Sequence, residues 1–437
     1  MATLSEHRSP EASPPAPAAP TGPPPPAPRS EDRAGAPLWA VLAFTLVNSL
    51  GTGAITNGMY FLTDSAFAFS QRKQYILGVS FGVAYIFGAL VTGRTLALVL
   101  ARATWLSARA ILLVLMGVLA IASSLPALVA LATDAPAPEW SLWTAALIYG
   151  PFSGALWPIV ESYLAGGRKG ASLRRATGHF NVFWSAALVL AFFGMAPLRS
   201  IGRPLDTLTA LAAIPLAAAV LLVWFRRTPA PHIEGAHDPR PPVFDDLLIV
   251  FRWLLPTSYV VLATLTPFLP GALKRIGLPD GWAMIAAATW MAARVGAFAV
   301  FQRWEGWHGR WWVPVAGLLG VLAGFAACIL APLVGAAGLP TMLLGLAVFG
   351  ASQGMIYLGA LYYAMEVVDD GAEAGGMHEA LIGVGYTVGP AFGLAVGLAV
   401  GEENASFEPI LLVGVMLLSC GLCALAGREI HARSRPA

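Results

Sequence analysis

Two arginines lie inside long apolar runs, at matching positions of the two halves of the sequence. Arg94 lies in TGRTLALVLAR and Arg294 in AARVGAFAVFQR, 200 residues apart (294 − 94 = 200). They precede the basic residues Arg102 and Arg303 by eight and nine positions (102 − 94 and 303 − 294), about 12 to 14 Å along a helix. A buried guanidinium requires a carboxylate, carbonyl groups or a bound anion. One hypothesis is a two-arginine clamp on an anionic ligand. The alternatives are a structural ion pair and side chains that extend to lipid headgroups.

A second group of ionisable residues lies near the ends of predicted helices. His179 and His378 each begin an apolar segment and are 199 positions apart (378 − 179). One interpretation is proton coupling by a carboxylate or an imidazole. The other is a gate in which Glu161 and Glu379 pair with arginines, although the start of a helix also favours Glu379 without any such role. The residues of this gate or proton-coupling hypothesis are Glu161, Arg174, Arg175, His179, Glu366, His378 and Glu379.

Uncharged polar and aromatic residues recur at helical spacing within the apolar segments, which is the pattern of a cavity lining. The same residue types also hold helices together in membranes, so helix packing is the competing interpretation for each of them. Together with the two arginines, the predicted substrate-binding residues are Arg94, Arg294, Asn48, Thr52, Tyr149, Ser153, Trp157, Gln353, Tyr357 and Tyr386.

The composition indicates a membrane protein. Of 437 residues, 57% are hydrophobic and 11% are charged, whereas soluble domains carry about 25% charged residues. The net charge of +2 implies no nucleic-acid partner. The cysteines lie in apolar runs at Cys328, Cys420 and Cys423 and form no disulfide or zinc pattern. The sequence has no phosphate-binding loop, and HEALI lacks the second histidine of a metalloprotease helix. We therefore expect no enzyme activity, no cofactor and no metal.

Apolar runs of the length that crosses a bilayer occur about twelve times. Their continuous apolar character predicts helices and excludes a barrel. The spans are expected near residues 38–62, 74–98, 109–131, 141–164, 178–198, 205–225, 247–271, 280–301, 312–334, 340–366, 377–400 and 408–427.

Sequence composition also divides the chain into domains. Residues 1–37 are rich in proline and alanine and are expected to form a disordered cytoplasmic tail. We predict two six-helix bundles at 38–226 and 247–428, a cytoplasmic linker at 227–246 and a tail at 429–437. The loops that this topology assigns to the cytoplasm contain more Lys and Arg than the others, which places both termini in the cytoplasm. The expected location is the bacterial cytoplasmic (inner) membrane.

The two bundles resemble each other in sequence. YGPFSGALWPIVESYLAGG, starting at Tyr149, is similar to FGASQGMIYLGALYYAMEV, starting at Phe349. Gly150 and Gly154 match Gly350 and Gly354 at an offset of 200 (350 − 150). A parallel six-plus-six repeat is expected of two bundles related by an axis along the membrane normal.

The spans and the repeat resemble the major facilitator superfamily over residues 38 to 430. PIVESYLAGGRKGASLRRATG is similar to the end of the family's fourth span, and FQRWEGWHGRW to a degenerate form of its charged loop. Ala101 replaces the usual aspartate of that loop in the first half, and GVGYTVGPAFG is similar to the antiporter motif but lies in span eleven. The paired arginines resemble those of nitrate and nitrite porters, without their glycine-rich signatures.

The resemblance implies an all-α membrane protein that moves a small polar solute, anionic if Arg94 and Arg294 face the cavity, across the bilayer by alternating access between two bundles. A coupling ion is compatible with it, and we expect a monomer. The alternatives are a non-transporting sensor or scaffold with the same fold and a transporter of amphipathic, drug-like molecules. An enzyme is disfavoured because no catalytic constellation is clustered in the sequence.

Overall fold

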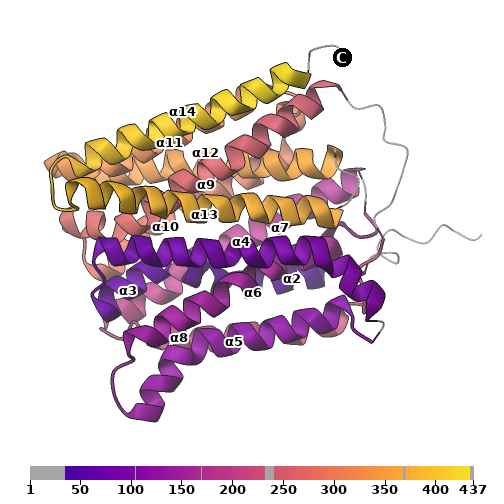
Figure 1. Cartoon of the computed structure of the whole chain (residues 1–437), viewed down its shortest axis with the longest axis horizontal. Coiled ribbons are helices and arrows are strands. Elements are labelled where there is room, and N and C mark those ends of the chain that lie inside the picture. The colour runs from indigo at the N-terminus through magenta and orange to yellow at the C-terminus, as the bar shows by residue number, and fades with distance from the viewer. Residues whose placement is uncertain (1–34, 104, 169, 232–240, 368–370, 434–437) are drawn as a thin grey trace, which may run out of the picture.

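The computed structural model describes residues 35–103, 105–168, 170–231, 241–367 and 371–433. Within these ranges every regular element is helical, which confirms the predicted all-α class. The helices run side by side along the longest axis of the molecule (Figure 1). We call the end of the bundle that holds Leu38 and Arg433 the terminal end, and the end where the last helix begins at Phe407 the opposite end.

The first six spans form one half of the molecule, the N-half. The first predicted span is divided at Asn57, whose side-chain amide donates to Thr56 Oγ1 at 2.8 Å within an Asn-Gly turn. The helices of the N-half are α2 (Leu38–Thr56), α3 (Met59–Phe67), α4 (Gln71–Arg102), α5 (Ala108–Thr133), α6 (Glu139–Ala165), α7 (Gly170–Ser200) and α8 (Asp206–Leu221), followed by the 3-10 turn Leu222–Trp224.

The last six spans form the C-half. Its helices are α9 (Val243–Arg275), α10 (Asp280–Arg303), α11 (Trp312–Leu330), α12 (Gly338–Val367), α13 (Gly371–Val400) and α14 (Phe407–Arg433), with short 3-10 turns at Glu305–Trp307, Ala331–Leu333 and Gly335–Ala337. Several helices extend beyond their predicted spans. Helix α9 begins at Val243, inside the predicted linker, and α14 continues to Arg433, into the predicted tail. Both extensions are polar helical turns, which an apolar-run criterion leaves out.

Eleven helical segments of the described chain are long and apolar enough to cross a membrane. Helix α6 has sufficient length at 27 residues but is not among the eleven. Its sequence contains two glutamates, two prolines and several Ser, Tyr and Gly residues, which lower its hydropathy. Eleven of the twelve predicted spans each correspond to one helix, and the first corresponds to α2 and α3 together. All twelve are thus helical, as an integral membrane protein requires.

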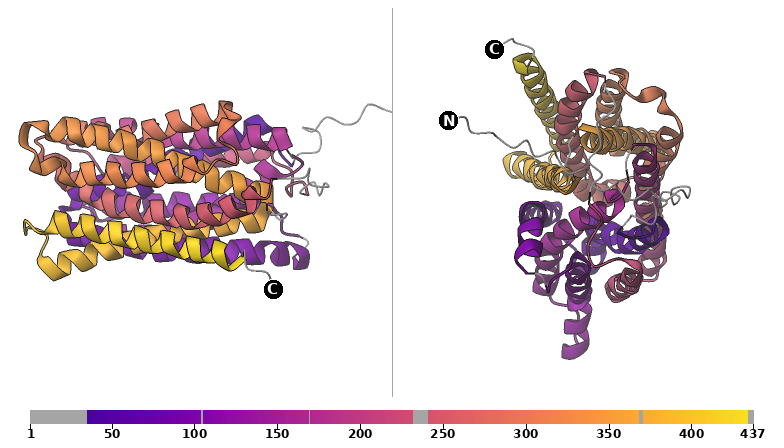
Figure 2. Two further views of the ribbon diagram at one scale, coloured as in Figure 1. Left: turned by 90° about the horizontal axis from the view of Figure 1, so that it is seen from above. Right: turned by 90° about the vertical axis from the view of Figure 1, so that its right-hand side faces the viewer.

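The two halves meet along two helix pairs. Helix α4 packs against α13, and α7 packs against α10 (Figures 1 and 2). Glycines permit the first contact: a Cβ at Gly82 would lie 2.6 Å from the carbonyl oxygen of Tyr386, and one at Gly383 would lie 2.5 Å from Ile86 Cγ1. Small residues allow helices in membranes to approach this closely. Side chains next to these glycines therefore face the other half.

The structure changes the register of the repeat between α4 and α10. Gly150 and Gly154 of α6 lie against Phe81 and Tyr85 of α4. Their counterparts Gly350 and Gly354 of α12 lie against Trp290 and Arg294 of α10. The residue equivalent to Arg294 is therefore Tyr85, at an offset of 209 (294 − 85), and not Arg94. Arg94 lies nine residues further along α4 (94 − 85), about 14 Å toward the terminal end.

Candidate functional site

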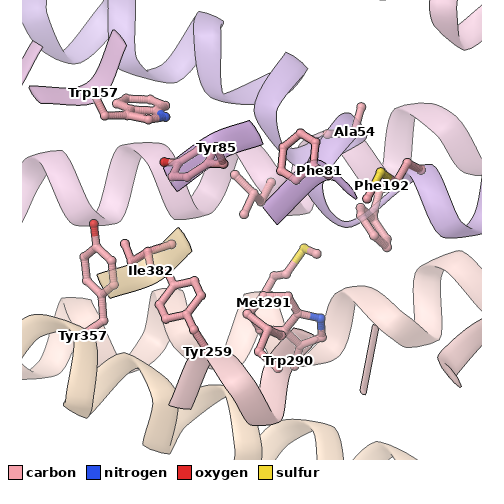
Figure 3. Close-up of a cluster of buried hydrophobic side chains, with 14 of the residues drawn as sticks. Ala54, Phe81, Tyr85, Trp157, Phe192, Tyr259, Trp290, Met291, Tyr357 and Ile382 are labelled. Carbon is pink, nitrogen blue, oxygen red and sulfur yellow. The ribbon is translucent and has the colours of Figure 1, made fainter. Parts of the chain in front are cut away.

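A cavity of about 50 Å³ lies between the two halves, near the middle of the bundle. Figure 3 shows Trp157 and Tyr85 of the N-half facing Tyr259, Tyr357 and Ile382 of the C-half. The lining of the cavity is aromatic apart from one threonine, one isoleucine and two glutamates. The lining residues are Thr52, Tyr85, Trp157, Glu161, Phe180, Trp184, Tyr259, Tyr357, Glu379, Ile382 and Tyr386. Seven aromatic rings and two carboxyl groups at an interface between repeats suit a small organic solute.

The two glutamates of the cavity come from different halves. Glu379 accepts a hydrogen bond from the Tyr85 hydroxyl, which links α13 to α4. Glu161 on α6 is 1% exposed, and neither of its carboxyl oxygens has a hydrogen-bond partner in the described part of the chain. Buried carboxyl oxygens are normally paired, so Glu161 is left with acceptors for a donor that the protein itself does not supply.

Arg294 lies beside this cavity on α10. Its Nε donates to Ser185 Oγ of the N-half at 3.0 Å, and Nη1 donates to Gln353 Oε1 at 3.2 Å. The guanidinium lies between the rings of Trp184 and Trp290, 4.3 and 4.6 Å from their centroids. Its Nη2 and the Gln353 side-chain nitrogen have no partner among the described residues. Two buried donors therefore remain available next to Trp184, which lines the cavity.

The structure brings together part of the predicted substrate-binding set. Thr52, Trp157, Tyr357 and Tyr386 line the cavity, and Arg294 and Gln353 lie beside it. Tyr149 instead faces a separate, smaller cavity inside the N-half, and Asn48 and Ser153 are buried outside the lining. Arg94 belongs to α4, but its side chain lies outside the described residues. Because α4 is shifted by nine residues relative to the predicted match, the proposed symmetry of the two-arginine clamp is wrong.

The predicted gate residues divide between two places. Arg174 Nη1 lies 3.3 Å from Glu366 Oε1 and joins α7 to α12 across the halves at the terminal end. A second cavity, of about 380 Å³, is lined by this pair and by His179. The Nδ1 of His179 lies 2.6 Å from the Arg175 carbonyl oxygen. His378 packs edge-on against Tyr357, with ring centroids 4.9 Å apart. The expected pairing of Glu161 and Glu379 with Arg174 and Arg175 is wrong. Both glutamates line the central cavity instead, and Arg175 is exposed.

The opposite end is also closed between the halves. Arg199, at the end of α7, is almost fully buried, with its Nη2 2.7 Å from Asp64 Oδ2 and 3.3 Å from Asp280 Oδ1. Asp64 belongs to the N-half and Asp280 begins α10 of the C-half. Arg199 also lies over the Phe61 ring. Ion pairs that cross the interface thus lie toward both ends of the cavity.

Sequence reasoning missed Tyr85, Tyr259 and Trp184 of the cavity, and Arg199 at the opposite end of the bundle. The one available signal for Tyr85 was the glycine spacing of α6, because Gly154 approaches the Tyr85 backbone as Gly354 approaches that of Arg294. Tyr259 and Trp184 are aromatic residues in apolar runs, which sequence alone does not distinguish from ordinary packing.

The arrangement matches solved structures over almost its entire length. The structure of the nucleoside transporter NupG aligns with a TM-score of 0.60 at 12% identity, covering 90% of this chain and 98% of that one. A major facilitator superfamily transporter, FucP in the outward conformation, aligns with a TM-score of 0.55 at 12% identity, covering 89% and 98%. This chain has the major facilitator fold.

A third structure of this fold, a bacterial homolog of the human lysosomal transporter Spinster in an inward-facing and unoccupied conformation, aligns with a TM-score of 0.63. The identity is 16%, and the alignment covers 94% of this chain and 100% of the other. No protein-family model and no curated protein matches the sequence. At these identities the major facilitator fold is shared and the subfamily is not resolved.

Proposed function

We propose that this protein is a secondary transporter that moves a small polar solute by alternating access of a central site between two bundles. The observation that carries the proposal is the central cavity, which is lined from both halves and closed toward each end by contacts between them. Rocking of one half against the other opens such a site to one side at a time. Neighbouring structures of the same fold are transporters, which supports this assignment over an enzyme.

We place the terminal end, with both chain termini, in the cytoplasm of a bacterial inner membrane, where Arg174 and Glu366 form the inner closure and Arg199 the outer one. The substrate enters the cavity from the lipid-free ends of the interface, and the protein works as a monomer with an optional coupling ion. The small volume of the cavity fits a closed intermediate between outward-open and inward-open states.

Two engineered disulfides test alternating access directly. A Cβ at Gly178 would lie 3.3 Å from Gln302 Cβ, and one at Gly281 would lie 3.1 Å from Ser200 Cβ. Both pairs join α7 to α10 across the halves, one at each end, and both separations are close to disulfide geometry. The pairs are introduced as cysteines into a variant in which Cys328, Cys420 and Cys423 are replaced by alanine.

Each variant is reconstituted into liposomes and assayed for uptake of a library of labelled sugars, nucleosides, amino acids and organic acids. We expect either disulfide to abolish uptake and a reductant to restore it. The control is a disulfide between Ala84 and Gly150, inside the N-half, where a Cβ on the glycine would lie 3.0 Å from Ala84 Cβ. Uptake that persists with both cross-links formed would refute alternating access. Absence of uptake for every solute would favour a sensor or scaffold.

A further inference from the structure

Buried groups of both charge signs surround the central cavity without a counter-ion among the described residues. Glu161 and Glu379 line it, and Arg294 is beside it, each with 4% exposure or less. None of the three forms an ion pair within the described ranges. Burial of unpaired charges of either sign is costly, and such residues in a membrane protein mark sites that a ligand completes.

The acidic and basic groups are close enough to engage one small molecule. Arg294 lies 4.3 Å from the centroid of the Trp184 ring, and that ring lies 5.1 Å from the Tyr357 ring in the same cavity lining as Glu161 and Glu379. The Tyr259 ring centroid lies 6.5 Å from that of Tyr357. Both tyrosines line the cavity. A ligand in the cavity therefore has an acceptor wall at the glutamates and a donor wall at Arg294 and Gln353.

The polar atoms that lack hydrogen-bond partners on the two walls, counted among the described residues, are complementary to a molecule with an anionic end and a cationic end. On the donor wall, Arg294 Nη2 and Gln353 Nε2 have no partner among the described residues, and the two side chains are joined by the bond from Arg294 Nη1 to Gln353 Oε1, so they can donate together to one oxyanion. On the acceptor wall, neither oxygen of Glu161 has a partner within the part of the chain that the structure describes. The aromatic rings between them, including Trp157 and Tyr357, favour an organic cation over a hydrated metal ion.

We propose that the central cavity binds a zwitterionic organic solute, with its carboxylate or other oxyanion at Arg294 and Gln353 and its ammonium group at Glu161. The proposal rests on the transport function proposed above and narrows its substrate from a small polar solute to one that carries both charges. A zwitterion fits because it neutralises both walls, whereas an anion leaves Glu161 unpaired and a cation leaves Arg294 unpaired.

Matched probes separate the three charge types on one carbon skeleton. The first set is phenylalanine, phenethylamine and 3-phenylpropionate, and the second is 4-aminobutyrate, butylamine and butyrate. Binding to the detergent-purified full chain is measured by isothermal titration calorimetry. We expect the zwitterion of at least one set to bind at least about tenfold more tightly than its amine and its acid, since each lost charge-assisted hydrogen bond costs about that factor.

Two variants assign the walls. Glu161→Gln is expected to lower zwitterion affinity about tenfold or more while leaving the acid unaffected, and Arg294→Gln to lower it similarly while leaving the amine unaffected. Glu139→Gln, at the exposed start of the same helix as Glu161, and Arg203→Gln, in an exposed loop pair with Asp206, are the matched controls. Both controls are expected to retain wild-type affinity.

The proposal is overturned if an amine or an acid binds as tightly as its zwitterion, if neither zwitterion binds, or if Glu161→Gln and Arg294→Gln leave the preference unchanged. Its failure is distinct from failure of the transport function. Uptake of a sugar or an organic acid that the cross-links abolish would retain alternating access and reject the zwitterion. Zwitterion binding without uptake of any solute in the library would retain the zwitterion site and reject the transport function.

Discussion

Arg199 is a buried cation with two carboxylate partners, one in its own half of the molecule and one in the other half. Removing each partner should therefore have a different effect. Asp64 Oδ2 lies 2.7 Å from Arg199 Nη2 within the N-half, and Asp280 Oδ1 lies 3.3 Å away in the C-half. The exposed fractions of the side chains are 4% for Arg199, 23% for Asp64 and 52% for Asp280. We expect Asp64→Asn to lower the stability of the fold and Asp280→Asn to weaken the contact between the halves.

The magnitudes follow from exposure. Removing one partner of a buried pair costs about 3 to 5 kcal/mol, and the remaining Asp280 and the partial exposure of Asp64 reduce this to about 2 kcal/mol for Asp64→Asn. The N-half spans 187 residues (224 − 38 + 1), a size at which 1 kcal/mol corresponds to about 2 to 4 °C, so the melting temperature should fall by roughly 4 to 8 °C. An exposed pair contributes about 0.5 kcal/mol, so Asp280→Asn should shift the equilibrium between closed and open states about twofold.

Two assays read these effects separately. Differential scanning fluorimetry of the purified protein gives the melting temperature. The rate at which a methanethiosulfonate reagent modifies a cysteine at Thr52, in the cysteine-free variant, reports how often the cavity opens to that side. Glu139→Gln, which removes an exposed pair inside the N-half, should change neither reading. An equal fall in melting temperature for Asp64→Asn and Asp280→Asn, or an unchanged labelling rate for Asp280→Asn, would refute the reasoning.

Two further predictions concern packing and pH. A Cβ at Gly88 would overlap the carbonyl oxygen of Pro151 on α6, so Gly88→Ala should cost about 1 to 3 kcal/mol or more and lower the melting temperature, while Gly117→Ala, with nothing within 4 Å, should leave it unchanged or raise it slightly. Equal effects of the two substitutions would contradict the close contact between α4 and α6. In the loop after α10, burial lowers the pKa of His308, opposed by Glu305 and assisted by Arg174. Because the unfolded chain then binds a proton more readily than the folded one, stability should decline as pH falls below about 6.5. His308→Gln should reduce the fall in melting temperature between about pH 7.5 and 5.5, and an identical decline would show that His308 does not contribute.

The arginine comparison shows where sequence reasoning stops. Arg94 and Arg294 match at the offset of 200 that aligns α6 with α12, but α4 aligns with α10 at 209. Helix α4 starts 209 residues before α10 (280 − 71) and ends 201 before it (303 − 102), so its extra turns, residues 95–102, lie at the terminal end. At this offset Arg94 matches Arg303 (303 − 94 = 209) and not Arg294. The alignment of α4 with α10 depends on which backbone atoms Gly150 and Gly350 approach. A comparison of the two sequence halves alone does not contain these contacts.

The glutamates show a related limit. Glu161 and Glu379 were predicted near helix ends as partners of arginines, because distance along a helix was the only measure of depth available. The structure places both at the central cavity. Helix α13 begins eight residues before Glu379 with a glycine-rich turn, whereas Glu161 does lie one turn before the end of α6, with its side chain turned toward the cavity. The rotation of each helix about its axis decides whether a side chain faces lipid, a neighbouring helix or the cavity, and close packing at glycines sets that rotation.

The sequence by itself determined the number of spans, their approximate ends, their helical nature and their grouping into two similar halves. These follow from local properties, because the length of an apolar run fixes whether it crosses a bilayer and the absence of water forces its backbone into a helix. Tertiary structure alone decided that Tyr85 is the counterpart of Arg294, that Tyr85 bonds Glu379 across the interface, and that Arg199 closes the opposite end. Those facts depend on how helices distant in sequence approach one another, and contacts of this kind are set by the packing of the whole bundle.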